Sequence, residues 1–336
     1  MPTSHRSHGF TTLKLIMKAG LLCGCLAFFF YGLDLSATHS VLLTYSPVKA
    51  GLLILWFLTS FLLLGFRLHV IGQGRLRYKD CVSSVFLGFF ANSIFPARIG
   101  EAIKGLYLKV ISGKSIARVI SLIFWERFCD LNMMLGLILL VAAAGDLTRY
   151  LLPLLLTVIT GWAMLLAVHL FFRKHPASIS KIPWPWLQNS VRHLSQKPDR
   201  ALTLKLATAN LLVWGQFILE MFIAIYWIAG FEISLTAALN VFVISALAFA
   251  IPASPGGMGV YDAAIVFALG KYGIPAEDAV ALAILMRAIQ YGPTLIIGTV
   301  MIMSKSNGLS KIFRPAAARK MLAAMAMAPT RINRKS

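Results

Sequence analysis

Six long apolar stretches recur along this chain, and they constrain its fold more than any other feature. Crossing a bilayer as a helix takes about 20 predominantly apolar residues, and a helix satisfies its own backbone hydrogen-bonding groups in hydrocarbon. The predicted spans are residues 14–33, 48–68, 117–144, 151–172, 205–229 and 279–303. Only 13% of the residues are charged, against about 25% in a soluble domain. The sequence therefore predicts an all-α polytopic membrane protein with about six full spans.

Lysine and arginine gather between the apolar stretches, and this distribution predicts the topology, because cytoplasmic loops carry an excess of both residues. The basic segments are 67–80, which begins with Arg67, 173–200, and the tail 305–336. The segments with few positive charges are 34–47, 145–150 and 230–235. We expect the basic segments and the N-terminal residues 1–12 to be cytoplasmic, and the others to be loops that face outside.

The N-terminus resembles a signal peptide, because a basic start is followed by an apolar stretch. The sequence Ser36-Ala37-Thr38 is a poor cleavage site, however, and the rest of the chain stays in the membrane. We expect an uncleaved first span.

Two further hydrophobic segments, residues 81–111 and 236–270, are each broken in the middle by proline and glycine. Basic residues flank the first and acidic residues flank the second, so the first should enter and leave from the cytoplasm and the second from outside. Hairpins of opposite entry predict an inverted repeat with halves at 10–144 and 151–303. Alternatively, each hairpin is a pair of short complete spans. Both alternatives place one membrane transporter domain at residues 13–304.

The first break is expected to form half of a transport site, because broken helices at membrane depth line watery cavities. The residues predicted to bind substrate there are Asn92, Pro96, Arg98, Gly100 and Glu101. Pro96 and Gly100 turn the backbone and leave N–H groups free to hold an anion. Arg98 and Lys104 could bind a phosphate while Glu101 balances their charge. The alternative is that the basic side chains extend to the cytoplasmic interface.

The second break is expected to form the other half of the site. Its predicted substrate-binding residues are Pro255, Gly256, Gly257, Gly259 and Asp262. The glycines permit a tight backbone approach and positive φ angles, although they also serve ordinary close packing of membrane helices. Asp262 requires a partner near the bilayer interior, and Arg287 on the last predicted span is expected to provide it.

Charged side chains inside spans are costly and are functional candidates by default. Glu126, Arg127 and Asp130 share one span, at spacings that allow Arg127 and Asp130 to pair. These three residues are predicted to bind substrate, with a structural salt bridge between helices as the alternative. Glu220 has no partner at helical spacing, which makes it a candidate for ion coupling or a hydrogen-bonded packing residue.

Several classes of function find no support in the sequence. The chain has no zinc-ligand spacing, no nucleotide-binding loop, and no serine-hydrolase or metalloprotease motif. We therefore expect no cofactor, no metal ion and no enzymatic activity. The net charge of +20 comes from loops and the tail, without a separate basic domain, so nucleic acid is not an expected partner.

Taken together, these motifs resemble the flippase-like membrane domain of lysylphosphatidylglycerol synthases, a family that includes stand-alone bacterial and archaeal proteins. The resemblance covers roughly residues 10–305. It is carried by Asn92 with Pro96-Ala97-Arg98-Ile99-Gly100-Glu101, by Glu126-Arg127 with Asp130, and by Pro252 with Ser254-Pro255-Gly256-Gly257, Gly259 and Asp262. Family members often have glutamate at the position of Asp262. The aminoacyl-transferase domain of the full synthases is absent, so we do not expect lysylphosphatidylglycerol synthesis.

The resemblance implies movement of a polar-headed lipid between leaflets of the bacterial inner membrane. The expected substrate is an anionic, aminoacylated, hopanoid or polyprenyl lipid, and lipid-synthesis enzymes are expected partners. Two alternatives stay open: an intramembrane enzyme that modifies a lipid headgroup with Glu126, Asp130 or Glu101 as acid and base, and an accessory subunit of a lipid-synthesis complex. Neither the lipid nor the oligomeric state follows from the sequence.

Overall fold

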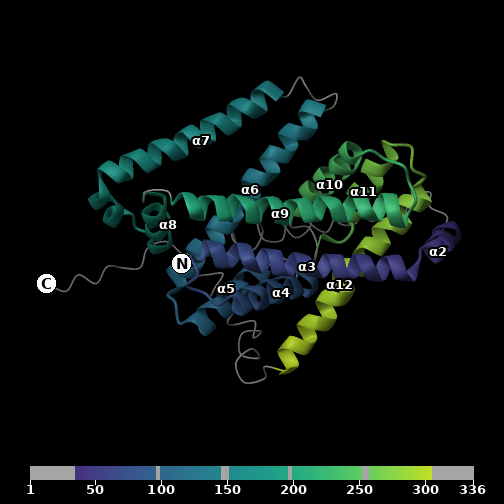
Figure 1. Ribbon diagram of the computed structural model, residues 1–336, viewed down its shortest axis with the longest axis horizontal. Helices are drawn as coiled ribbons and strands as arrows, with labels where there is room; N and C mark the ends of the chain where they lie inside the picture. Colours follow the sequence, from purple (N-terminus) through teal and green to yellow (C-terminus); the bar gives the residue numbers. More distant parts are fainter. Residues whose placement is uncertain (1–34, 96–98, 145–150, 196–198, 252–256, 305–336) are drawn as a thin grey trace, which may run out of the picture. The chain divides into compact units, whose positions relative to one another are not determined.

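The computed structural model describes residues 35–95, 99–144, 151–195, 199–251 and 257–304. Within these ranges the chain is helical and contains no strand (Figure 1). Among the described residues, five helices are long and apolar enough to cross a membrane. They are α3 (Pro47–Ile71), α6 (Ile116–Ala144), α7 (Leu151–Lys174), α9 (Arg200–Ile223) and α12 (Ala276–Ser304). The prediction of an all-α polytopic membrane protein is confirmed, and the predicted span at 14–33 lies outside the described residues.

Each predicted hairpin consists of two helices with a break between them. The first contains α4 (Tyr78–Ile94) and α5 (Gly100–Ser112), and the second contains α10 (Leu235–Ala250) and α11 (Val260–Gly270). The second helix of each pair is short, with 13 residues in α5 and 11 in α11. At 1.5 Å per residue these helices extend about 20 and 17 Å, well short of a hydrocarbon core of about 30 Å. The lengths favour hairpins that enter and leave the membrane on one side.

Two segments expected to be loops contain helices. The segment 34–47, which is expected to face outside, is not a loop, because α2 (Leu35–Thr44) occupies most of it. The basic segment 173–200 contains the short helix η3 (Pro176–Lys181) and α8 (Pro185–Ser195). Helix α8 packs on α6 and α7, and the buried Ser190 and Ser121 hydroxyls are 3.0 Å apart. Short polar helices lack the apolar length that identifies a span, which explains why the sequence pattern missed them.

The chain folds into two compact units, and the first comprises residues 1–58, 89–98 and 217–296. Its described part contains α2, the paired helices α10 and α11, most of α12 and the helical turn η4 (Ala224–Ile228). Its fully buried side chains include Leu53, Met221, Ile225, Ile265 and Leu269. This unit holds the second break of the chain.

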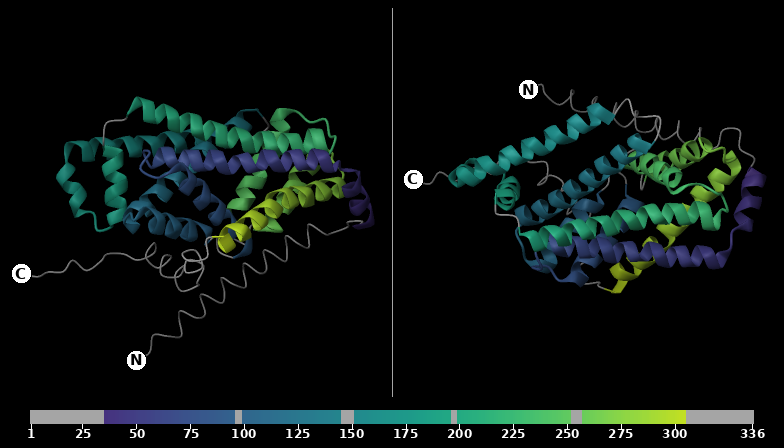
Figure 2. Two further views of the ribbon diagram at one scale, coloured as in Figure 1. Left: turned by 60° about the horizontal axis from the view of Figure 1, so that its bottom comes forward. Right: turned by 45° about the horizontal axis from the view of Figure 1, so that its top comes forward.

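The second unit comprises residues 59–88, 99–216 and 297–336. It contains α5, α6, α7 and α8 together with parts of α3, α4 and α9. Helices α6 and α7 diverge from their connection, and α8 lies between their far ends (Figures 1 and 2). The buried core includes Phe61, Leu68, Leu87, Ile103 and Leu108, and the Phe61 ring stacks on Phe86 with centroids 3.8 Å apart.

Helices α3 and α4 approach closely at Gly65, and this contact supplies a stability test. A Cβ atom at Gly65 would lie 2.9 Å from the Cα of Val82, whereas a Cβ at Gly51 on the same helix meets nothing within 4 Å. We expect Gly65→Ala to lower the free energy of unfolding by about 1–3 kcal/mol, because the backbones must separate. Gly51→Ala should be neutral or stabilising, by up to about 1 kcal/mol. Thermal unfolding in detergent compares the two, and equal melting temperatures would contradict the predicted contact.

Candidate functional site

Six charged side chains form one ion-pair cluster within the second unit, and we call this set the charge cluster. Its cations are Arg67, Lys104 and Arg127, and its carboxylates are Glu101, Glu126 and Asp130. The equal numbers of each sign make the cluster formally neutral. Helices α3, α5 and α6 contribute its members, so the cluster joins three segments that are far apart in the sequence.

Glu126 lies at the centre of the charge cluster and is buried. Its Oε2 atom accepts a hydrogen bond from the Lys104 ammonium group. Its Oε1 atom lies 3.4 Å from Nη2 of Arg67 and 3.7 Å from Nη2 of Arg127. A carboxylate at membrane depth requires such partners, because an isolated buried charge costs far more than any packing gain.

Arg67 forms the inner wall of the charge cluster, and its side chain is 0% exposed. Its Nη1 atom donates to Asp130 Oδ1 at 2.6 Å and to Asn210 Oδ1 at 3.1 Å. Within the described part of the chain, its Nε atom has no hydrogen-bond partner. Arg67 therefore connects α3 to α6 and, through Asn210, to α9.

Arg127 forms the outer edge of the charge cluster, and its side chain is 50% exposed. Its Nη2 atom lies 3.1 Å from Asp130 Oδ2 and 3.5 Å from Glu101 Oε1. The Oε2 atom of Glu101 is buried and has no hydrogen-bond partner among the described residues. Arg127 is thus the cluster cation that an anion could reach, and its planar guanidinium suits bidentate binding of phosphate.

A second ion pair lies in the first unit, where Arg287 on α12 binds the start of α11. Its Nε atom donates to Asp262 Oδ1 at 2.5 Å, and its Nη2 atom donates to the Gly257 carbonyl at 2.9 Å. The other carboxylate oxygen, Asp262 Oδ2, accepts the Gly259 N–H at 2.8 Å. We call these four residues the hairpin clasp, because their bonds connect α12 to the end of the second break.

Two tyrosine rings enclose the Arg287 guanidinium. Its central carbon lies 4.6 Å from the Tyr261 ring centroid and 5.2 Å from the Tyr291 centroid, within the range of cation–π attraction. The Tyr291 hydroxyl also accepts a hydrogen bond from Nη1 at 3.0 Å. Each of the three guanidinium nitrogens of Arg287 donates a hydrogen bond, which suits a structural role at the hairpin.

Glu220 on α9 is buried in the same unit and is 2% exposed. Its Oε1 atom accepts a long hydrogen bond of 3.4 Å from Gln290, which also contacts the Tyr261 hydroxyl. Its Oε2 atom has no hydrogen-bond partner in the described residues, which also provide no cation for this carboxyl. A carboxyl group in these surroundings is suited to bind a proton or a small cation.

The structure places eight of the residues that the sequence singled out in two groups, one in each unit. Glu101, Glu126, Arg127 and Asp130 meet in the charge cluster, and the predicted pairing of Asp262 with Arg287 is confirmed. Gly257 and Gly259 have φ angles of 70° and 81°, in the region that glycine favours. Asn92 is half-buried on α4, and Gly100 is buried at the first residue of α5. Pro96, Arg98, Pro255 and Gly256 lie outside the described residues.

Two basic residues lie elsewhere than expected. Arg67 was assigned to a cytoplasmic loop, but it lies inside α3 and is fully buried. An arginine after a long apolar run ordinarily marks the end of a span, and only the distant Glu126 and Asp130 explain its burial. The alternative that Lys104 extends to the interface is wrong, because Lys104 is buried against Glu126. Asn210 was missed because a single asparagine in an apolar helix carries no pattern.

Comparisons with known proteins agree with the fold. Residues 15–298 match the protein family described as "Lysylphosphatidylglycerol synthase TM region". A UPF0104 membrane protein of Methanocaldococcus jannaschii is 27% identical over 226 residues, covering 63% of this chain and 92% of the relative. A UPF0104 membrane protein of Methanothermobacter thermautotrophicus is 25% identical over 255 residues, covering 69% of this chain and 75% of the relative.

Proposed function

Because the chain belongs to the lysylphosphatidylglycerol synthase transmembrane-region family, we propose that this multi-pass membrane protein moves a polar-headed lipid between the leaflets of the bacterial inner membrane. Both termini would lie in the cytoplasm. The observation that carries the proposal is Arg127, a half-exposed cation at the edge of a buried, neutral charge cluster. Charged groups inside membrane domains are retained mainly where they line a substrate or ion pathway.

The charge cluster supports binding of an anionic headgroup by exchange of partners. A lipid phosphate that approaches Arg127 would replace Asp130 or Glu101, whose oxygens are 3.1 and 3.5 Å from the guanidinium. The buried pairs of Glu126 with Arg67 and Lys104 would keep their geometry. The lipid tails would stay in hydrocarbon, so only the headgroup would cross the polar region.

The proposal is tested by leaflet exchange in proteoliposomes that contain tail-labelled phosphatidylglycerol. We expect Arg127→Ala to slow protein-dependent exchange about 10- to 100-fold, because a charge-assisted hydrogen bond is worth about 1.5–3 kcal/mol. Arg77→Ala is the matched control. Arg77 also pairs with an aspartate three residues away but is 81% exposed, outside the spans, where its hydrogen bond to Asp80 raises its pKa. This control should exchange lipid at the wild-type rate.

Other outcomes would favour the alternatives. Mass spectrometry of the same vesicles detects chemical change, and an altered lipid mass without exchange would identify an intramembrane enzyme. Unaltered lipid without exchange, for phosphatidylglycerol and for an aminoacylated or polyprenyl lipid, would favour an accessory subunit. Equal rates of leaflet exchange for Arg127→Ala and wild type would show that Arg127 does not take part in transport.

Energy coupling is proposed to use Glu220, since the sequence has no nucleotide-binding loop. Glu220→Gln preserves the shape of this buried side chain and its bond to Gln290 while removing the group that can take up a proton. We expect the variant to keep the wild-type melting temperature but to lose any response of exchange to an imposed pH gradient. A wild-type response in the variant would exclude Glu220 as the coupling residue.

A further inference from the structure

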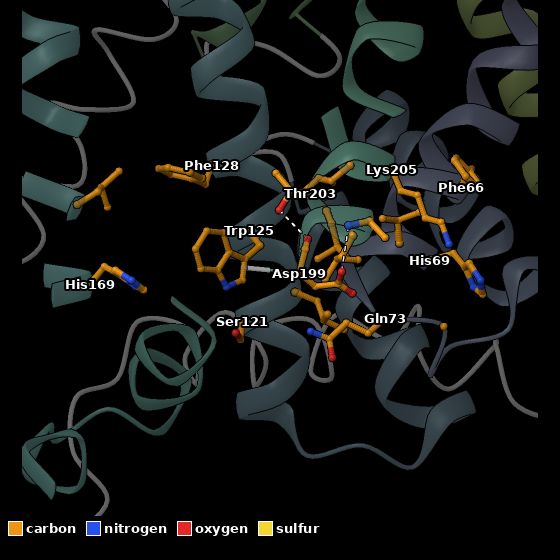
Figure 3. A pocket seen from close by; sticks show the side chains of 18 of the residues that line it. Phe66, His69, Gln73, Ser121, Trp125, Phe128, His169, Asp199, Thr203 and Lys205 are labelled. Atoms are coloured by element: carbon orange, nitrogen blue, oxygen red, sulfur yellow. Dashed lines mark hydrogen bonds between the residues drawn. The ribbon is translucent and has the colours of Figure 1, made fainter. Parts of the chain in front are cut away.

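The second unit contains a pocket that the charge cluster does not use. It has a volume of about 1100 Å³, at or above the upper end of the size range for small-molecule sites. Residues of α3, α6, α7 and α9 line it. Figure 3 shows Trp125 and His169 on one side of the pocket and His69 and Lys205 on the other.

The pocket is polar at one end and apolar along the rest of its length. Gln73 and Gly74 follow the end of α3, His169 lies near the end of α7, and Asp199 and Lys205 lie at the start of α9. These positions belong to helix ends that the loop charges predict to face the cytoplasm. Further into the spans, the walls are aromatic and aliphatic, with Phe66, Phe128, Trp162, Leu166 and Leu206. A cavity with this polarity matches an amphipathic ligand that has one charged end.

On α6, the residues that line the pocket and those of the charge cluster lie on different faces of the helix. On α6, Ser121, Trp125 and Phe128 line the pocket, whereas Glu126 and Asp130 belong to the charge cluster. These two sets differ in helical register, so the pocket-lining side chains of α6 point away from its ion-pairing side chains.

Helix α7, which lines the pocket, is largely exposed along its length. Among the α7 residues whose side chains are described, none is buried. Its contact with α6 includes the Phe128 and Trp162 rings, whose centroids are 6.1 Å apart. In a membrane the exposed side chains of α7 would meet lipid, which is the apolar molecule at highest concentration there.

Two polar groups at the pocket lack an ion-pair or hydrogen-bond partner among the described residues, and they point to the chemistry of the ligand's polar end. Trp125 Nε1 is buried without a hydrogen-bond partner among the described residues, and an ester carbonyl would accept its N–H. Lys205 makes no ion pair within the described part of the chain. An ammonium group at a membrane interface attracts anionic headgroups.

We propose that this pocket binds an anionic phospholipid, with a hydrocarbon chain between α6, α7 and α9 and its phosphate beside Lys205. This inference deepens the proposed function, and it rests on that function only in taking a membrane lipid as the ligand. The pocket would hold the lipid on the cytoplasmic side by its tail, separately from the headgroup site at Arg127.

The test uses phosphatidylglycerol with a photoactivatable diazirine in its acyl chain, in vesicles of phosphatidylcholine and phosphatidylglycerol. After irradiation, mass spectrometry should locate the tail on Phe128, Trp162 or Leu166. Leu166→Trp fills the pocket and should reduce labelling about five- to tenfold. Leu156→Trp is the matched control, because Leu156 lies on the same helix outside the pocket and is 54% exposed, against 57% for Leu166. Lys205→Glu should reduce labelling by the anionic probe about fivefold, but not labelling by a phosphatidylcholine probe.

Absence of tail labels on pocket residues, as expected if residues 1–34 or a second copy of the chain fill the pocket, would overturn the inference. Equal labelling in Leu166→Trp and Leu156→Trp would do the same. Leaflet exchange in the same vesicles separates this result from the proposed function. Labelled pocket residues without leaflet exchange would support the lipid site and exclude translocation. Leaflet exchange without labelled pocket residues would exclude the lipid site and leave the proposed function standing.

Discussion

Replacing Arg67 with alanine is expected to lower the free energy of unfolding by about 3–5 kcal/mol, the usual cost of leaving a buried charge without its partner. Arg67 is 0% exposed and its guanidinium binds Glu126, Asp130 and Asn210. Its removal would leave the Glu126 and Asp130 carboxylates and the Asn210 amide without this partner. Unfolding in detergent, followed by tryptophan fluorescence, measures the change.

Arg77→Ala provides the control, because the exposed pair of Arg77 with Asp80 should contribute little to the free energy of unfolding. Arg67→Lys should recover only part of the loss, since a lysine cannot hold two acceptors in the fixed fork of a guanidinium. If Arg67→Ala unfolds like Arg77→Ala, the charge cluster does not stabilise the second unit.

Replacing Arg287 with alanine is expected to release the end of the second break and to lower the free energy of unfolding by about 3 kcal/mol. The variant would lose bonds to Asp262 and to the Gly257 carbonyl in one step, together with the stacking on Tyr261. Hydrogen–deuterium exchange should therefore speed up at residues 257–262, where the Gly259 N–H is bound to Asp262, while α6 keeps its protection.

Lys271→Ala is the matched control for Arg287. Lys271 also lies over an aromatic ring, with its ammonium 5.2 Å from the Phe267 centroid, but its side chain is exposed and outside the hairpin clasp. The Lys271→Ala variant should show the same hydrogen–deuterium exchange at residues 257–262 as the wild type. Unchanged exchange at residues 257–262 in Arg287→Ala would mean that the turn is held by backbone packing alone.

The helices of this protein follow from its sequence because apolar length is a local property. The predicted spans at 48–68, 117–144 and 279–303 agree with α3, α6 and α12 to within a few residues at each end. Both broken hairpins were also predicted, since proline and glycine inside an apolar run leave few other structures. The helix α2 was missed because ten residues of mixed polarity carry no comparable signal.

Ion pairs could be predicted from the sequence in two situations only. Either both partners lie on the same helix, or a charged residue has one candidate partner of opposite charge within the predicted spans. Arg127 with Asp130 and Arg287 with Asp262 were identified in this way. Arg67 was misplaced because its partners, Glu126 and Asp130, lie about 60 residues further along the chain on another helix. The role of Lys104 could not be predicted for the same reason, because its partner Glu126 lies on another helix. Tertiary packing of α3, α5 and α6 decides these pairs, and a single sequence does not encode that packing in any local pattern.

The formal neutrality of the charge cluster determines the electrical work of transport under the proposed function. A site with no net charge adds nothing to the charge that crosses the membrane, so the cargo and any proton carried by Glu220 set that charge. With the cell interior negative, outward movement of one negative charge releases about 2.3 kcal/mol per 100 mV. An anionic lipid would thus be drawn outward by the membrane potential without a nucleotide, whereas a cationic aminoacylated lipid would have to move against it.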